Sequence, residues 1–361
     1  MSKGKFSDTE KKVASNIINL NLPHYRKAYS DKTAFLMASL CELSYIVWES
    51  RFVGLEKNVV DKFQSHVIEK LSNSKNQTFL TDFVVSLLKD NDDSKDTLIE
   101  ELNAFSLQVD NEISWISDPV TDTQAFIAFN DDYAVLVFRG TETTSIKDIR
   151  TDTKSRLITS TSNGLVHEGF QKAFESVEET INERLQSDKL KDKPLYITGH
   201  SLGGALATIA TREFKSPIKI AASYTFGSPR VGNEDWINRI KSPVYRLVNA
   251  ADSVTMLPPG SIPMSGLSFL VGLVPSFGEQ LKAWLSKYNG YIHAGNMRYL
   301  TNCIPNDHKE VRLLYSVSFL YRIKAVIQHS LFRQLVKDHS ISVYRKKLTF
   351  IAAKRNKLNL P

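Results

Sequence analysis

The fold is decided by residues 194–212, which read PLYITGHSLGGALATIATR. The run 194–198 is apolar and β-forming, and the run 202–212 is rich in alanine with a helical pattern. Between them stands the pattern G-x-S-x-G, at 199–203. A strand, a tight turn and a helix are the context in which this pattern exposes its serine hydroxyl above the edge of a sheet. The stretch therefore predicts a nucleophile at Ser201, with a capping serine in a glycine-rich loop as the alternative.

Short β-rich runs on both sides of this stretch alternate with helical patterns. The clearest helical stripe lies within 170–185, where apolar residues recur every three or four positions. Strands that alternate with helices are typical of βαβ units, so we predict an α/β fold with a mostly parallel central sheet. The β-rich runs are 125–129, 133–138, 195–198, 221–226 and 244–248.

The two ends of the chain differ from this middle part. Residues 1–110 carry apolar faces at helical spacing, which predicts a helical N-terminal region, either separate or packed on the core. Residues 111–361 are expected to form the α/β part, with an insert at about 260–290. From about residue 310 the pattern is helical again, which predicts a helical C-terminal extension that ends in a basic tail.

The composition narrows the class of protein. Of the 361 residues, 42% are hydrophobic and 24% are charged, which excludes a disordered or fibrous chain. The two cysteines, Cys41 and Cys303, exclude a disulfide framework and a four-cysteine zinc site. The net charge of +7 suits an anionic surface, but no basic cluster with interleaved aromatic residues supports a nucleic-acid partner. With no apolar leader and no long apolar run, we expect a cytoplasmic chain, or one exported without a cleaved signal peptide.

A serine nucleophile needs a base that takes its proton. It also needs hydrogen-bond donors that stabilise the oxyanion formed in the reaction. The backbone N–H of Leu202, directly after the serine, is one such donor by geometry. A second donor is expected from the turn after the buried run 135–138, where Thr141 offers its N–H and its hydroxyl. We therefore predict an oxyanion hole formed by Thr141 and Leu202.

Five segments stand in a fixed order, and through them the chain resembles the class 3, fungal-type triacylglycerol lipases of the α/β-hydrolase fold. The resemblance covers about residues 125–300. It implies hydrolysis of lipid esters through a Ser–Asp–His triad, with Ser201 as nucleophile, Asp252 as acid and no metal or organic cofactor. The segments are FRGT at 138–141, VHEGF at 166–170, GHSLGG at 199–204, TFGSPRVGN at 225–233 and RLVNAADSV at 246–254, followed by LPP at 257–259.

Chain order narrows the choice of acid and base, because α/β-hydrolases run Ser…Asp…His. Asp252 follows the β-rich run 244–248, whereas Asp235 is better explained as a helix-start residue. His339 stands at a junction between two helical patterns, and with Tyr344 it resembles the family's terminal histidine segment. We therefore predict His339 as the base. The other histidines are His308 as the alternative base, His293 in a structural segment, His329 within a helical pattern, and His167 and His200 as hydrogen-bonded scaffold residues.

Two segments are candidates for a lid over the site. One is the polar segment 145–150, and the other is the apolar stretch 262–285 within the insert, which could instead pack on the core. An apolar cap of this kind would touch a membrane or lipid-droplet surface. The predicted function is a serine-dependent lipase or carboxylester hydrolase acting on glycerolipids. The alternatives are a phospholipase A-type activity on membrane glycerophospholipids and a non-catalytic lipid-binding scaffold.

Overall fold

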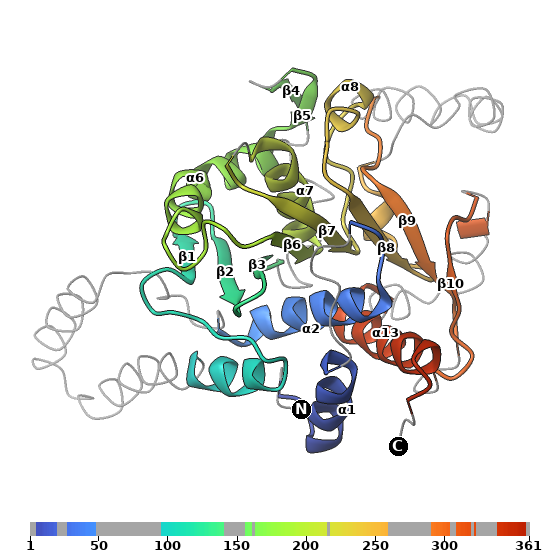
Figure 1. Cartoon of the computed structure of the whole chain (residues 1–361). Coiled ribbons are helices and arrows are strands. Elements are labelled where there is room, and N and C mark those ends of the chain that lie inside the picture. The colour runs from blue at the N-terminus through green and yellow to red at the C-terminus, as the bar shows by residue number, and fades with distance from the viewer. Residues whose placement is uncertain are drawn as a thin grey trace, which may run out of the picture.

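The computed structural model describes ten ranges of the chain, and they form a main sheet covered by helices on both faces and a separate two-stranded sheet (Figure 1). Within these ranges the main sheet has eight strands in the order β1-β2-β3-β6-β7-β8-β9-β10. The described ranges are 5–19, 27–47, 95–140, 156–160, 163–214, 217–258, 290–303, 308–318, 321–322 and 338–358. The lid candidates 145–150 and 262–285 lie outside them, as do residues 48–94 of the predicted helical N-terminal region.

The centre of the main sheet is parallel, as predicted. Strands β3, β6, β7, β8 and β9 pair in parallel, while β1 and β2 at one edge and β10 at the other pair antiparallel. All five predicted runs form strands. The strands are β1 (Trp115–Asp118), β2 (Thr123–Phe129), β3 (Ala134–Phe138), β6 (Leu195–His200), β7 (Ile220–Phe226), β8 (Val244–Asn249), β9 (Asn296–Leu300) and β10 (Leu313–Leu314), with β4 (Leu157–Thr159) and β5 (Leu165–His167) in a separate hairpin-like pair.

Alternation along β3 divides the core into two layers. Its residues Val135 and Val137 belong to the apolar cluster beneath the sheet, and Leu136 and Phe138 belong to the cluster above it. This period of two is expected of a strand that is buried on both faces. The sheet therefore separates two hydrophobic cores, each closed by its own helices.

The upper face is covered by α6 (Glu168–Leu185) and α7 (Leu202–Glu213) (Figure 1). The apolar stripe that the sequence shows in 170–185 is the buried face of α6, which includes Phe174, Val177 and Ile181. Half of the buried residues of α7 are alanine or glycine, which lets this helix lie close to the sheet. Its first turn thus comes to the end of β6, where the site is built.

The lower face is covered by helices from the two ends of the chain. α2 (Asp31–Val47) and α13 (Ile341–Arg355) lie side by side under the sheet, and α1 (Asp8–Ile18) packs against α13 (Figure 1). Ser7 caps α1 in a capping box with Glu10. The described N-terminal helices share one apolar cluster with β3 and α13. The helical C-terminal pattern begins later than expected, because Leu313–Leu314 forms β10 before α13.

Candidate active site

Ser201 lies at a sharp turn between β6 and α7. Its backbone has φ 57° and ψ −124°, a conformation that costs free energy for a residue with a side chain. Two glycines make the turn possible, since a Cβ at Gly199 would overlap the carbonyl of Gly203 and a Cβ at Gly203 would overlap that of Phe138. The Ser201 N–H donates to the carbonyl of Phe226 at 2.9 Å, which fixes the turn to β7.

The turn brings the Ser201 hydroxyl to an imidazole from the far end of the chain. His339, just before α13, has its Nε2 3.0 Å from Ser201 Oγ. Its Nδ1 lies 3.0 Å from each carboxylate oxygen of Asp252, which follows β8. Because a carboxylate only accepts hydrogen bonds, Nδ1 carries the proton and Nε2 accepts from the serine. A buried Ser–His–Asp row results, and its three residues are at most 2% exposed.

The Asp252 carboxylate is held in place by three further elements of the fold. Tyr344 of α13 donates its hydroxyl proton to Asp252 Oδ2 at 2.6 Å, and the N–H of Val254 donates to Oδ1 at 3.0 Å. The N–H of Asn249 in turn donates to the Tyr344 hydroxyl at 3.0 Å. Burial raises the pKa of Asp252, but attraction to His339 and these hydrogen bonds outweigh it and leave the pKa below its ordinary value. Asp252 is therefore a carboxylate at neutral pH.

A second histidine fixes the backbone of the first. His200 Nε2 lies 2.7 Å from the carbonyl of His339, and its Nδ1 lies 2.9 Å from the hydroxyl of Tyr45 in α2. A carbonyl can only accept, so Nε2 donates and Nδ1 accepts from the tyrosine. Burial, followed by the neighbouring His339, lowers the pKa of His200 to about 3, so its ring is neutral. The contact extends the site to the N-terminal helices.

The neutral state of His200 predicts a pH dependence of stability. Its pKa of about 3 in the folded protein lies below the unfolded value near 6.5, so the unfolded chain binds the extra proton as pH falls. We expect the free energy of unfolding of the wild type to fall on the order of a few kcal/mol more than that of His200→Asn between pH 7 and pH 4. Urea denaturation at half-unit pH steps measures both slopes. If the free energy of unfolding changed with pH by the same amount in both proteins, the buried neutral imidazole would be contradicted.

Other residues proposed from the sequence lie elsewhere. His308 packs edge-on against Phe350, with its Nδ1 3.2 Å from Cys303 Sγ. Asp235 is exposed in the first turn of the short helix α8 (Glu234–Ile237). His167 caps α6, where its Nδ1 accepts from the N–H of Phe170 at 3.3 Å. Thr141 and His329 lie outside the described residues, as do both lid candidates.

Two parts of the site were missed by sequence reasoning. Tyr45 had only a faint signal, in the LSY segment at 43–45, because its partner His200 is 155 residues away. The role of Tyr344 toward Asp252 was likewise unseen, although the residue was noted beside His339. Within the described ranges, no group of three or more His, Cys, Asp or Glu side chains is placed to hold a metal ion.

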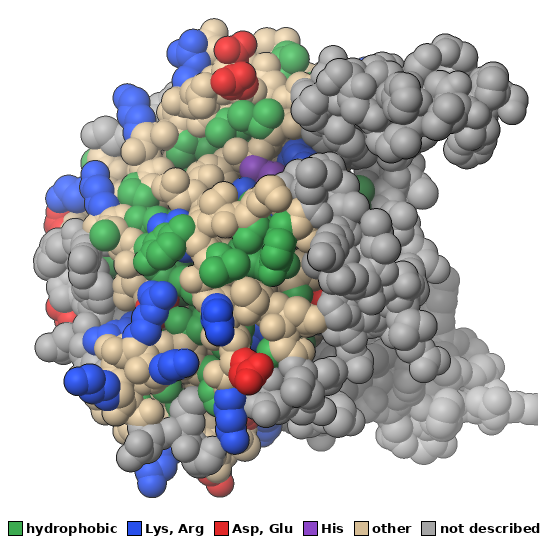
Figure 2. All heavy atoms as spheres, turned by 90° about the vertical axis from the view of Figure 1, so that its right-hand side faces the viewer, with side chains coloured by type: hydrophobic (Ala, Val, Ile, Leu, Met, Phe, Trp, Pro, Cys, Tyr) green, Lys and Arg blue, Asp and Glu red, His purple; other side chains and the backbone are tan. Residues whose placement is uncertain are grey.

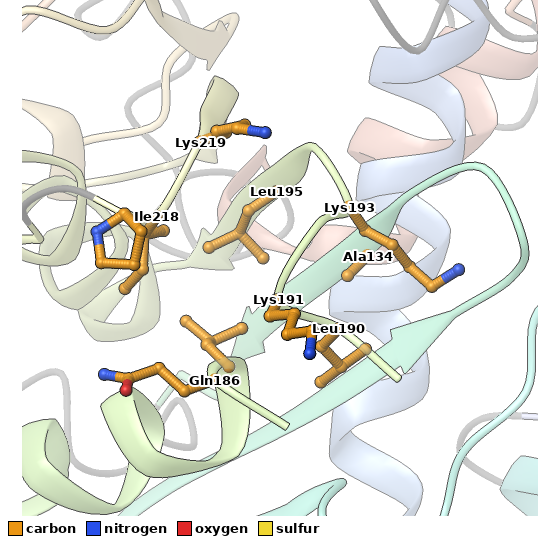
Figure 3. A pocket seen from close by; sticks show the side chains of 10 residues that line it. Ala134, Gln186, Leu190, Lys191, Lys193, Leu195, Ile218 and Lys219 are labelled. Carbon is orange, nitrogen blue, oxygen red and sulfur yellow. The ribbon is translucent and has the colours of Figure 1, made fainter. Parts of the chain in front are cut away.

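A small pocket lies at the opposite edge of the sheet and is not part of this row. Figure 3 shows its lining, which includes Ala134 and Leu195 at the starts of β3 and β6, and the lysines 191, 193 and 219. Ser201 follows the other end of β6. The pocket is therefore separated from the serine by the length of that strand.

The fold and the row of side chains define an α/β-hydrolase: a parallel sheet, a serine at a strand–helix elbow, and an acid and a histidine that follow in that order. Residues 135–261 match the family model described as lipase (class 3). Over this part of the chain, and through the ordered segments around it, the protein is similar to the class 3 lipases.

Relatives share only part of their length with this chain. A secreted mono- and diacylglycerol lipase 1 of Fusarium solani is 37% identical over 99 residues, which are 26% of this chain and 30% of the relative. The chloroplastic phospholipase A(1) DAD1 of Arabidopsis thaliana is 35% identical over 150 residues, which are 34% of this chain and 33% of the relative. The chain thus spans about a third of these two curated relatives. A solved triacylglyceride lipase of Rhizomucor miehei is 23% identical, with a TM-score of 0.46 over 68% of this chain and 85% of that one.

Proposed function

We propose that the protein is a serine hydrolase that cleaves acyl esters of glycerolipids. The observation that carries the proposal is the hydrogen-bonded row at the elbow, with Ser201 Oγ 3.0 Å from His339 Nε2 and His339 Nδ1 3.0 Å from Asp252. A serine hydroxyl is a weak nucleophile until a base takes its proton. The row supplies that base and a carboxylate that stabilises the imidazolium.

The reaction proceeds in two halves. Ser201 attacks the ester carbonyl while His339 takes the hydroxyl proton, and the collapsing intermediate releases the alcohol, which leaves with that proton. Water then attacks the acyl-enzyme while His339 takes a proton from it. The second intermediate collapses and releases the carboxylic acid, and His339 returns the proton to Ser201 Oγ. Asp252 keeps the imidazole oriented through both halves and remains ionised. The chain's own residues provide every proton transfer in this scheme.

The oxyanion of each tetrahedral intermediate needs donors next to the serine. Leu202 is the first residue of α7, so its N–H has no acceptor within the helix. We propose this N–H as one donor and Thr141 as the other. The positive end of the α7 dipole adds to the stabilisation of negative charge at this point.

Lipid esters are the proposed substrate class. Support comes from the match of residues 135–261 to the lipase (class 3) family model and from relatives named mono- and diacylglycerol lipases. The phospholipase A-type alternative has support from one relative named phospholipase A(1). Basic side chains are more numerous than acidic ones on the face drawn in Figure 2, which suits peripheral contact with an anionic lipid surface. No helix in the described ranges is both long and apolar enough to cross a membrane.

Access to the site requires movement. Ser201 has no exposed surface, so an ester carbonyl reaches its hydroxyl only when a covering group moves away. We propose that one of the two lid candidates, 145–150 or 262–285, makes this opening. A lid that opens at a lipid surface would couple activity to that surface.

A lipid panel with product identification tests the function. Emulsified mono-, di- and triacylglycerols and vesicles of phosphatidylcholine are incubated with the wild type and with Ser201→Ala, and released fatty acids are identified by mass spectrometry. We expect fatty acid release from acylglycerols by the wild type alone. Release from none of these esters would contradict the lipase, and would favour the non-catalytic scaffold.

Tyr344 is expected to act as a positioning residue for the acid. Replacing it by phenylalanine removes the 2.6 Å hydrogen bond to Asp252 and leaves the N–H of Asn249 without its acceptor. We expect Tyr344→Phe to lower kcat roughly 10-fold with little change in KM, because hydrogen bonds of this kind orient a group without touching substrate. Steady-state hydrolysis of a soluble p-nitrophenyl ester measures both constants.

Tyr299→Phe is the matched control, since this buried tyrosine of β9 donates to the carbonyl of Ala250 at 3.1 Å and does not contact the carboxylate. It should leave kcat within about 2-fold of the wild type. A rise in KM as the main effect of Tyr344→Phe would contradict the positioning role.

A further inference from the structure

Three arginines and a histidine gather behind the loop that carries Asp252. Arg246 projects from β8 and is 7% exposed, and Arg322 is 4% exposed. Arg230 and His293 complete the group, and both ring nitrogens of His293 are buried. Burial and then mutual repulsion lower the pKa of Arg246 to about 9, and burial and repulsion by Arg322 lower that of Arg230 to about 10. All three guanidinium groups are thus near one another and still charged at neutral pH.

Some of the N–H donors of this cluster are satisfied by the loop. Arg230 Nη1 donates to the carbonyls of Met256 and Pro258, at 2.5 Å and 2.6 Å. Arg322 donates to the hydroxyl of Thr255, which itself donates to the carbonyl of Asp252 at 2.8 Å. The cluster is therefore tied directly to the acid loop.

Other polar atoms of the cluster have no hydrogen-bond partner. They are Nε and Nη1 of Arg246, Nε of Arg322 and both ring nitrogens of His293. Burial first, and then the three arginines, keep the pKa of His293 well below its ordinary value, although the interaction with the backbone of Thr255 raises it. His293 is therefore neutral, with one ring N–H.

Among the described residues, none of the ion pairs involves these arginines. The residue opposite Arg246 on β9 is Met297, which brings no charge. Asp252 attracts Arg322, but its oxygens are taken by His339, Tyr344 and Val254. Within the described ranges, Arg246 and Arg322 are thus buried and Arg230 is partly exposed beside them, and none of the three forms an ion pair with an acid.

Such an arrangement is unfavourable unless an anion completes it. A buried charge with no partner costs several kcal/mol, and an arginine cannot avoid the cost by losing its proton. Guanidinium groups match the oxygens of phosphate in paired hydrogen bonds, and their charge matches an anion of one or two negative charges. The unpartnered polar atoms of Arg246, Arg322 and His293 belong to three separate segments of the chain, so they can approach one such group from different sides.

We propose that Arg230, Arg246, Arg322 and His293 form a binding site for a phosphate-type oxyanion behind the acid loop. The anion is either free inorganic phosphate or the phosphate of a glycerophospholipid head group. The first case does not depend on the proposed hydrolase activity, whereas the second rests on it. In both cases the bound anion braces the loop through Thr255 and thereby the position of Asp252.

Thermal unfolding of the full chain tests the site without any activity measurement. Sodium phosphate is titrated at constant ionic strength against sodium chloride. We expect a saturable rise of the melting temperature with phosphate and none with chloride, because only a ligand of the folded state stabilises it by mass action. A melting temperature that responds equally to both salts would overturn the proposal.

Two variants assign the effect to the cluster. Arg246→Met should lose the phosphate-dependent rise, and should melt no lower than the wild type in phosphate-free buffer, since it removes an unpaired buried charge. Arg156→Met is the control, because Arg156 is exposed and paired with Glu168, and it should keep the rise. If Arg246→Met does not fold, Arg322→Gln takes its place. A phosphate effect that survives the cluster variant would place the anion elsewhere and overturn the assignment.

The two possible sources of the phosphate, the free anion and the lipid head group, are distinguished with the Ser201→Ala variant, which is expected to cleave no ester. Monomeric dihexanoyl phosphatidic acid is compared with dihexanoylglycerol and with inorganic phosphate. A larger rise with the phosphatidic acid than with phosphate supports the head group, and an equal rise supports the free anion. Because these are binding measurements, a chain that hydrolyses no lipid but binds phosphate would contradict the proposed function and leave this site standing.

Discussion

Replacing Ser201 by alanine is expected to lower kcat for ester hydrolysis by at least about 10⁴-fold. The substitution removes the only atom of the elbow that can attack a carbonyl, while the backbone turn and the row behind it remain. Alanine also tolerates the turn no worse than serine, since both carry a Cβ at the same φ. Hydrolysis of p-nitrophenyl butyrate by purified wild type and variant, with circular dichroism to check folding, measures the loss.

A buried serine on the neighbouring strand gives the control for this variant. Ser223 lies in β7 with no hydrogen-bond partner for its hydroxyl, so Ser223→Ala removes a serine of equal burial without touching the row. It should retain the wild-type rate within about 2-fold. Activity of Ser201→Ala equal to that of Ser223→Ala would refute Ser201 as the nucleophile.

Replacing Asp252 by asparagine is expected to lower kcat roughly 10⁴-fold, with KM little changed. The carboxylate accepts from His339 Nδ1, from Tyr344 and from Val254. The asparagine side chain has one oxygen, which accepts, and one NH₂ group, which donates. The NH₂ group then faces either one of the other donors or His339 Nδ1, and in the second case the imidazole must carry its proton on Nε2. In that tautomer the ring can no longer take the proton of Ser201.

Asp235→Asn is the control, because Asp235 is exposed on α8 and was the rival acid in the chain. It should hydrolyse the same ester at the wild-type rate. Equal losses in the two variants, or a greater loss in Asp235→Asn, would mean that the acid has been wrongly assigned.

Local patterns were enough to predict the elbow and five of the strands, β2, β3, β6, β7 and β8, whereas the parallel strand β9 was not predicted. All the residues that determine the serine turn lie within 194–212. Each of the five predicted runs is buried on both faces, so its apolar residues are nearly continuous and the strand is easy to recognise. The short edge strands β1 and β10 were not predicted, because four and two residues carry too little periodicity. The C-terminal helix was expected to begin earlier for the same reason.

The contacts that complete the row are long-range, and no local pattern contains them. Ser201 and His339 are 138 residues apart, and Asp252 and His339 are 87 apart. His339 was selected through resemblance to a family segment, and the structure sets it beside Ser201 while His308 packs on Cys303. The contact between Tyr45 and His200 depends on how α2 lies under the sheet, which sequence periodicity does not determine.

The arginine cluster was invisible to sequence reasoning for a different reason. The sequence of the strand that carries Arg246 has no unusual feature, and only the register of the sheet shows that the uncharged Met297 lies opposite it on β9. Arg230 and Arg322 approach it from segments far apart in the chain. Net charge alone indicated a basic protein, but it did not indicate that three of the charges lie together and that two of them are buried.

Labelling with a fluorophosphonate is the most direct test of the triad. Such a probe forms a bond only with a serine whose proton is taken by a neighbouring base. Tandem mass spectrometry of the labelled wild type should place the adduct on Ser201; His339→Ala should abolish it, and His308→Ala should leave it unchanged. An adduct on another residue, or one that persists in His339→Ala and disappears in His308→Ala, would contradict the assignment of Ser201, His339 and Asp252.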